Sequence, residues 1–167
     1  MSTKKIYSEE KIWEFLSEIP DPEIPVISIV ELGVLRRIEI EHSKVIVTIT
    51  PTYSGCPAMK TFEDDITAKL TANNILNFEI LTVHSPAWTT DWITESAREK
   101  LRNFGIAPPI RGTADKGTLF DSGSKSVLCP LCNSKDTELK SQFGSTACKA
   151  LYQCNSCLEP FDYFKCI

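Results

Sequence analysis

Residues 32–50 read LGVLRRIEIEHSKVIVTIT, two runs rich in β-branched residues that are joined by the polar pair His42–Ser43. Each run has the length and composition of a strand, and a short polar pair between two such runs is typical of a tight turn. The stretch therefore predicts a β-hairpin.

Helices are predicted on both sides of the hairpin. Ser8 is a suitable N-cap, apolar residues follow at helical spacing, and Pro20 and Pro22 end the segment. After the hairpin, a second helix is expected to begin near Pro57. Its predicted inward face consists of Met59, Phe62, Ile66 and Leu70.

The segments that follow complete the first predicted domain. Residues 77–84, NFEILTVH, alternate as a third strand does. Residues 91–105, DWITESAREKLRNFG, predict a closing helix with Phe104 inward and Gly105 at its C-terminal cap. The order α-β-β-α-β-α predicts an α+β domain over residues 1–106, a small mixed sheet with helices on one face.

The composition changes after residue 106. Residues 107–128 are rich in Gly, Pro, Ser and Asp without sustained periodicity, so we interpret them as a linker. Six of the seven cysteines lie in the tail, residues 129–167. A second, metal-binding domain is therefore expected there.

Cysteine spacing in the tail predicts a metal site. Cys129–Cys132 and Cys154–Cys157 form two C-x-x-C pairs, and each such turn directs two sulfurs to one point. Four thiolates are what structural Zn²⁺ accepts, which predicts a zinc-ribbon-like module. Iron remains open, because two such pairs also build an electron-transfer iron centre. Cys148 and Cys166 are left over, either as plain thiols or as alternate ligands.

The seventh cysteine, Cys56, precedes Pro57 at the expected start of the second helix. A thiol at a helix N-terminus is favoured as a thiolate, the form needed for nucleophilic chemistry or for binding a soft metal. Neither histidine, His42 or His84, is placed to act as its base, so a metal-handling thiol is favoured over a hydrolase.

A proline-rich stretch contains two carboxylates, Asp21 and Glu23. Its prolines restrict the backbone to a rigid loop. Asp21 either caps the next turn or lines a pocket with Cys56 and Thr52. Both interpretations stay open at the level of the sequence.

Composition limits the class of protein. The chain is 42% hydrophobic and 24% charged, as in soluble globular proteins, and its sequence pI is about 5.3. An acidic chain binds phosphate backbones poorly, so nucleic acid is not expected as a partner. No apolar run suits a membrane span and no export signal is visible, which favours the cytoplasm and reduced cysteines.

Longer runs resemble a known family. DPEIPVISIVELGVLRRIEI (residues 21–40) and TPTYSGCPAM (50–59) resemble the iron–sulfur assembly domain of SufT-like proteins. PAWTTDWITESAREKLRNFGIAPP (86–109) and FGSTACKALYQCNSCLEPFDYFKCI (143–167) are similar to the PaaD family, also called PaaJ, associated with phenylacetyl-CoA epoxidase. The resemblance extends from about residue 8 to residue 167 and is least specific over 107–128.

The resemblance implies an accessory, non-catalytic subunit in aerobic phenylacetate degradation. Its role would be iron–sulfur cluster assembly or maturation of the oxygenase–reductase system, with the other subunits and especially the Fe–S reductase as partners. By position, Cys56 matches the reactive cysteine, where a cluster would bind transiently. Asp21 and Glu23 match the acidic loop, and the four paired tail cysteines match the metal knuckles.

Two alternatives remain: a rubredoxin-like electron carrier with iron in the tail, and a structural zinc-ribbon adaptor without cluster transfer. Trp88 and Trp92 flank a polar loop, which indicates core packing or a partner-binding surface. A homodimer would be unsurprising for a small α+β unit with two exposed tryptophans, but nothing in the sequence demands one.

Overall fold

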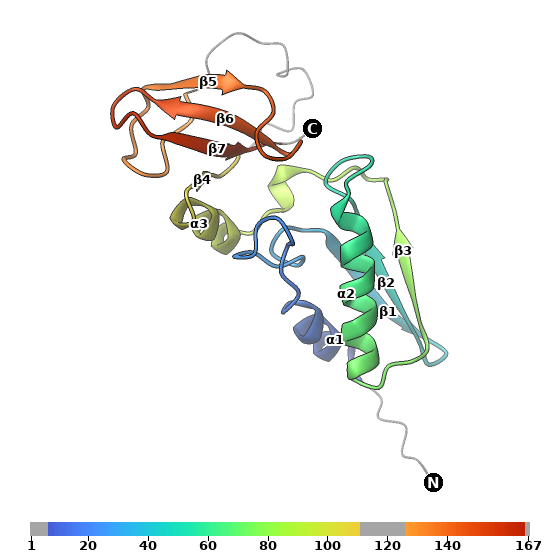
Figure 1. The fold of residues 1–167 in the computed structure, drawn as a ribbon. Coiled ribbons are helices and arrows are strands. Elements are labelled where there is room, and N and C mark those ends of the chain that lie inside the picture. The colour runs from blue at the N-terminus through green and yellow to red at the C-terminus, as the bar shows by residue number, and fades with distance from the viewer. Residues whose placement is uncertain (1–6, 111–125, 166–167) are drawn as a thin grey trace. The chain divides into compact units, whose positions relative to one another are not determined.

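A computed structural model describes residues 7–110 and 126–165. The chain forms two compact units, Met1–Trp88 and Thr89–Ile167 (Figure 1). Each unit has its own sheet, of three strands in the first and four in the second. The predicted α+β class, a small mixed sheet with helices followed by a ribbon module, is confirmed.

The first unit begins with helix α1, Glu9–Leu16. Its N-cap is Ser8, as predicted, and the Ser8 hydroxyl accepts a hydrogen bond from the backbone N–H of Lys11 at 3.3 Å. The buried residues Ile12 and Leu16 lie one turn apart on one face of the helix. This face anchors α1 to the core.

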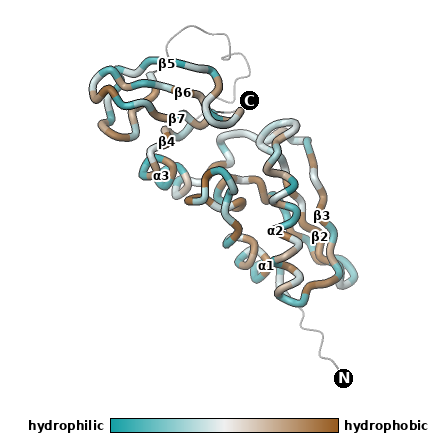
Figure 2. The backbone as a smooth tube through the Cα atoms, viewed as in Figure 1, coloured by the Kyte–Doolittle hydropathy of each residue, from teal (hydrophilic) through white to brown (hydrophobic). Residues whose placement is uncertain are grey.

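The predicted hairpin forms from strands β1, Leu35–Glu41, and β2, Lys44–Ile49, which pair antiparallel. His42 and Ser43 both have positive φ, 45° and 70°, the backbone that a two-residue hairpin turn requires. Strand β3, Phe78–Thr82, then pairs parallel to β2, so the sheet is mixed. Figure 2 shows hydrophobic residues (brown) recurring along β2 and β3.

Helix α2, Ala58–Ala72, lies with α1 over one face of this sheet (Figure 1). Its buried residues recur every four positions: Ala58, Phe62, Ile66 and Leu70. They pack with the inward residues of the strands, among which Val47 and Ile49 are fully buried. The prediction for α2 is confirmed, except that Met59 is only half-buried.

The second unit starts with a short 3₁₀ turn, Thr90–Trp92, and helix α3, Glu95–Asn103, whose N-cap is Thr94. Strand β4, Ile106–Ala107, follows directly. Gly105 lies between α3 and β4 with φ 89°, as expected for a residue that ends a helix. Phe104, expected to point inward, is 51% exposed, because the helix already ends at this residue.

Three more strands complete the ribbon: β5, Thr137–Ser141, β6, Lys149–Cys154, and β7, Pro160–Phe164. β6 pairs antiparallel with β5 and with β7. β4 then adds to the free edge of β7 in parallel, giving the order β4-β7-β6-β5. The ribbon is therefore a four-stranded sheet that includes β4, a strand at the start of the expected linker.

The compact units divide between Trp88 and Thr89, whereas the sequence places the domain boundary after residue 106. The difference arises because β4 pairs with β7 and carries α3 with it into the second unit. The expected linker, residues 107–128, is structured at both ends, since Ala107 belongs to β4 and Val127 is buried. Its residues 111–125 lie outside the described part of the chain.

In residues 7–110 and 126–165, none of the helices has the length and apolar character that a membrane span requires.

Candidate metal centre and the thiol before α2

The four paired cysteines of the tail come together in the ribbon. Cys129 and Cys132 precede β5, Cys154 ends β6, and Cys157 lies in the turn before β7. Their sulfur atoms all lie within 4.8 Å of one another. The Cys129 and Cys157 sulfurs are 3.8 Å apart, and the Cys132 and Cys154 sulfurs are 3.5 Å apart.

These separations fit a tetrahedral ion. A metal–sulfur bond of about 2.3 Å places neighbouring sulfurs of a tetrahedron about 3.8 Å apart. The two measured sulfur pairs lie near this separation, and all four thiols are close enough to share a single cation. These four cysteines therefore have the arrangement of a metal-binding site.

The surroundings of the sulfurs shift the pKa values of two of the thiols in opposite directions. The backbone N–H of Cys157 donates to the Cys154 sulfur at 3.5 Å and lowers the pKa of Cys154 to about 6. The pKa of Cys132 is raised to about 12, because the lowering effect of the Ser134 backbone N–H is outweighed by the neighbouring cysteines and burial. Four thiolates this close repel one another, so a bound cation is needed to ionise them all.

The two knuckles are joined outside the sulfur cluster as well. The Ser134 and Ser156 hydroxyls are 2.7 Å apart, and Asn155 bonds the backbone and the carboxylate of Asp136 at 2.9 Å. Each knuckle is followed by a residue with positive φ, Asn133 at 60° and Leu158 at 64°. The knuckles thus have the same backbone course, which holds the four sulfurs in place.

Two cysteines of the tail, Cys148 and Cys166, lie outside the C-x-x-C pairs. Cys148 is buried near the opposite end of β6, and its sulfur lies 3.1 Å from the Thr146 hydroxyl. It is not part of the four-sulfur cluster, and a ligand role of Cys148 in exchange or at a second site stays a prediction. Cys166 lies outside the described residues.

Cys56 lies directly before the N-cap of α2, close to the helix start as expected. Pro57 is the N-cap of α2, so Cys56 precedes the cap instead of forming it. Its carbonyl accepts from the Met59 N–H at 3.3 Å, and Gly55 before it has φ 83°. The Thr52 hydroxyl lies 3.9 Å from the half-buried Cys56 sulfur. The structure therefore brings Cys56 and Thr52 together in the β2–α2 loop.

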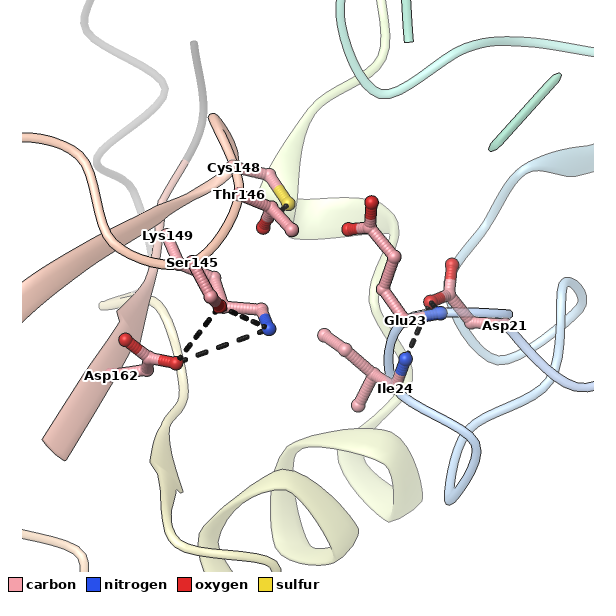
Figure 3. Close-up of polar contacts among 8 residues, drawn as sticks. All are labelled: Asp21, Glu23, Ile24, Ser145, Thr146, Cys148, Lys149 and Asp162. Carbon is pink, nitrogen blue, oxygen red and sulfur yellow. Dashed lines mark hydrogen bonds and ion pairs between the residues drawn. The ribbon is translucent and has the colours of Figure 1, made fainter. Parts of the chain in front are cut away.

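Asp21 has a structural role in its own loop. Its side chain is 7% exposed, and one carboxylate oxygen accepts from the backbone N–H groups of Glu23 and Ile24 at 2.8 and 2.7 Å (Figure 3). The Asp21 N–H in turn donates to the Ile27 carbonyl at 2.8 Å. The capping interpretation of Asp21 is thereby confirmed. Glu23 is half-buried in the same loop.

A cluster of three polar side chains, Ser145, Lys149 and Asp162, was not predicted from the sequence. At the start of β6, the Lys149 ammonium lies 3.1 Å from the Ser145 hydroxyl of the β5–β6 loop and 3.9 Å from the Asp162 carboxylate (Figure 3). The signal that could have found it is the run Gly144-Ser145-Thr146 followed by Lys149, small and hydroxyl residues before a lysine. Only the pairing of β6 with β7 brings Asp162 to this run.

Two family models match the chain. Residues 9–74 match the iron-sulfur cluster assembly protein family, and residues 113–165 match the PaaD zinc beta ribbon domain. The chain is also 49% identical over 157 residues to an Escherichia coli (strain K12) protein that is named as a subunit of a "Putative 1,2-phenylacetyl-CoA epoxidase". The alignment covers 94% of this chain and 92% of that protein.

The chain belongs to the PaaD family.

Other similarities of this PaaD-family chain concern its assembly domain. It is 29% identical over 103 residues to the Fe-S protein maturation auxiliary factor of Porphyromonas gingivalis (strain ATCC BAA-308 / W83), covering 60% of this chain and 97% of that protein. A Bacillus anthracis domain of unknown function, DUF59, has a similar fold, with a TM-score of 0.52 and 27% identity over 56% of this chain and 90% of that one. A conserved hypothetical protein from Thermotoga maritima gives a TM-score of 0.50 at 25% identity, covering 58% and 96% of the two chains.

Proposed function

We propose that this protein is an accessory subunit of a phenylacetyl-CoA epoxidase system, in which it assembles or matures the metal centres of the oxygenase–reductase components. The observation that carries the proposal is the 49% identity, over nearly the full length of both chains, to the E. coli protein named as a subunit of that epoxidase. The match of residues 9–74 to the iron-sulfur cluster assembly family supports the maturation role.

The client in this proposal is the Fe–S reductase of the system, and Cys56 is the thiol that receives and passes on iron–sulfur units. Cys56 is half-buried, so part of this residue is open to solvent and to a client. The neighbouring Thr52 hydroxyl can donate a hydrogen bond to a Cys56 thiolate. Asp21 and Glu23 shape the acidic loop, with Asp21 acting through its backbone hydrogen bonds.

Zinc is the metal that we assign to Cys129, Cys132, Cys154 and Cys157. Four thiolates in a closed tetrahedral set are typical of structural zinc, which supplies folding free energy and no redox chemistry. The bound ion would neutralise two of the four thiolate charges, and the knuckle backbones would keep the sulfurs oriented.

Substitution of the functional thiol tests the proposal. We expect Cys56→Ser to fold and to retain its zinc, but to lower the iron and acid-labile sulfide content of the co-expressed reductase about tenfold or more, since serine is a poor soft-metal ligand. Cys148→Ser is the matched control for loss of a thiol outside the zinc cluster and should leave reductase loading unchanged. Normal cluster loading of the reductase with the Cys56→Ser variant would refute the role of Cys56.

The four-sulfur cluster also suits a second function, electron transfer, because the same separations accept iron. Elemental analysis and a visible spectrum of protein purified anaerobically separate the two functions. About one zinc per chain and no colour is the expected result. Iron in the cluster with a reversible visible redox change would make the protein an electron carrier and overturn the zinc assignment.

A further inference from the structure

The β5–β6 loop contains donors that the ribbon fold leaves unused. Lys149 is a charged side chain with only 8% of its surface exposed. An ammonium group has three N–H donors, and among the described residues that of Lys149 makes one hydrogen bond, to Ser145 at 3.1 Å. Asp162, at 3.9 Å, is too distant for a second hydrogen bond. Burying an ammonium with spare donors is costly unless an acceptor arrives.

The backbone of the same loop offers further donors. The Gly144 N–H donates to the Lys149 carbonyl at 2.7 Å, and the Lys149 N–H donates to the Thr146 carbonyl at 3.1 Å, which together close the loop. Between these two bonds, the N–H groups of Ser145, Thr146 and Ala147 donate to no acceptor in the described part of the chain. Consecutive free N–H groups in a tight loop are a recurring anion-binding arrangement.

Gly144, at the start of the loop, allows the loop backbone to lie close to Asp162 and Lys149. A Cβ atom at Gly144 would lie 2.8 Å from an Asp162 carboxylate oxygen and 3.3 Å from the Lys149 Cβ. A larger residue would therefore force the Asp162 carboxylate to shift and would crowd the Lys149 side chain. Ser145 is exposed and Thr146 is half-buried, so both residues of the loop can be reached from solvent.

We propose that the loop Gly144–Lys149 is a binding site for a phosphate group, held by the Lys149 ammonium, the Thr146 hydroxyl and the free loop N–H groups. A tetrahedral oxyanion has enough acceptor oxygens to satisfy all of these donors together. Asp162 is the internal competitor, because its carboxylate faces the same ammonium and reduces its attraction for an anion. The site lies at the end of β6 opposite the metal-ligating Cys154.

Calorimetric titration of the metal-loaded full chain with inorganic phosphate tests the site, with sodium chloride used to keep the ionic strength constant. We expect saturable binding that Lys149→Gln weakens about tenfold or more, as for loss of a charge-assisted hydrogen bond. Lys140→Gln is the matched control, since Lys140 is exposed on β5 and pairs with Glu138. It should bind phosphate as the unsubstituted chain does.

Two further variants keep the test decisive if Lys149→Gln does not fold. Thr146→Ala should weaken phosphate binding severalfold, whereas Asp162→Asn should strengthen it by removing the competing carboxylate. A purely structural role of the Lys149–Asp162 pair predicts no gain with Asp162→Asn. Unchanged affinity in Lys149→Gln or Thr146→Ala, or no binding beyond that of chloride, would overturn the proposal.

The source of the phosphate is resolved by a second titration with ADP. Tighter binding of ADP than of inorganic phosphate would assign the site to the phosphate of a larger molecule, and equal or weaker binding would assign it to free phosphate. Binding of neither would refute the site. All of these titrations are independent of Cys56 and of cluster loading of the reductase. Failure of the phosphate site would therefore not refute the proposed function, and failure of that function would not refute the site.

Discussion

At the scale of single residues, Trp88 decides between two interpretations that the sequence left open. Its side chain is 5% exposed, and the indole N–H donates to the Leu32 carbonyl at 3.0 Å. This is the arrangement expected of a buried tryptophan, whose polar N–H needs a partner. Trp88 therefore belongs to the core of the first unit, and the premise that it is exposed for dimer formation is wrong.

Trp88→Phe should lower the free energy of unfolding by about 1–3 kcal/mol, because the buried Leu32 carbonyl loses its donor and the smaller ring leaves a gap. Urea denaturation followed by circular dichroism measures this loss. Trp13→Phe is the control in the same unit, since Trp13 is only half-buried and its indole N–H has no partner in the described part of the chain. Equal losses in the two variants would contradict the importance of the Leu32 hydrogen bond.

At the scale of secondary-structure elements, α3 is held by a buried arginine. Arg98 is 5% exposed and donates to two carbonyls, that of Thr90 before the helix at 2.7 Å and that of Pro109 beyond β4. One planar guanidinium thus connects the 3₁₀ turn, α3 and the segment after β4. A lysine ammonium, as a compact charge, cannot reach both carbonyls in the same way.

Arg98→Lys should therefore destabilise the second unit by about 2–3 kcal/mol, since a charge-assisted hydrogen bond to a buried carbonyl is lost. Arg102→Lys is the matched control on the exposed side of the same helix and should stay within about 0.5 kcal/mol. Thermal unfolding of the metal-loaded chain would show the difference in midpoint. Coincident midpoints for both variants would exclude the bridging role of Arg98.

Elements specified by neighbouring residues were predictable, and elements that depend on distant partners were not. The turn at His42–Ser43 and the Ser8 cap follow from a few adjacent residues, so the hairpin and α1 were predicted correctly. β4 has only two residues, too few for any periodicity, and forms because β7 is available to pair with it. This long-range pairing also moved α3 into the second unit.

The same distinction applies to the candidate sites. The metal cluster was predicted because C-x-x-C spacing encodes its geometry locally. The position of Cys56 was predicted to within one residue, since Pro57 marks the start of α2. The Lys149–Asp162 pair was missed because its two residues lie on neighbouring strands, and only the strand register places them together.

At the scale of the whole molecule, the metal cluster is also part of a core. The buried cluster of the ribbon consists of Ala107, Val127, Cys129, Cys154 and Phe161. Two of these five residues, Cys129 and Cys154, belong to the four-cysteine cluster. Removing the metal would therefore remove the bonds that hold part of this small hydrophobic core together. The first unit has a larger core of its own that contains none of the four ligands.

Chelation of the metal should therefore unfold the second unit and spare the first. Hydrogen exchange measured by mass spectrometry should show lost protection in β5, β6 and β7, with protection retained in β1 and β2. Metal-loaded Cys148→Ser should keep its ribbon protection, since Cys148 is not a ligand of the cluster. Persistent protection of the ribbon strands in the metal-free chain would show that the fold does not depend on the ion.

The pairing of β4 with β7 bears on how such a protein can be rearranged by gene fusion. A ribbon transferred to another gene as its cysteine-bearing residues alone would leave β4 behind, and β7 would present an open row of backbone donors and acceptors. Unprotected strand edges invite pairing between chains and aggregation. A gene fusion that is to yield a soluble ribbon should therefore transfer α3, β4 and the cysteine tail together.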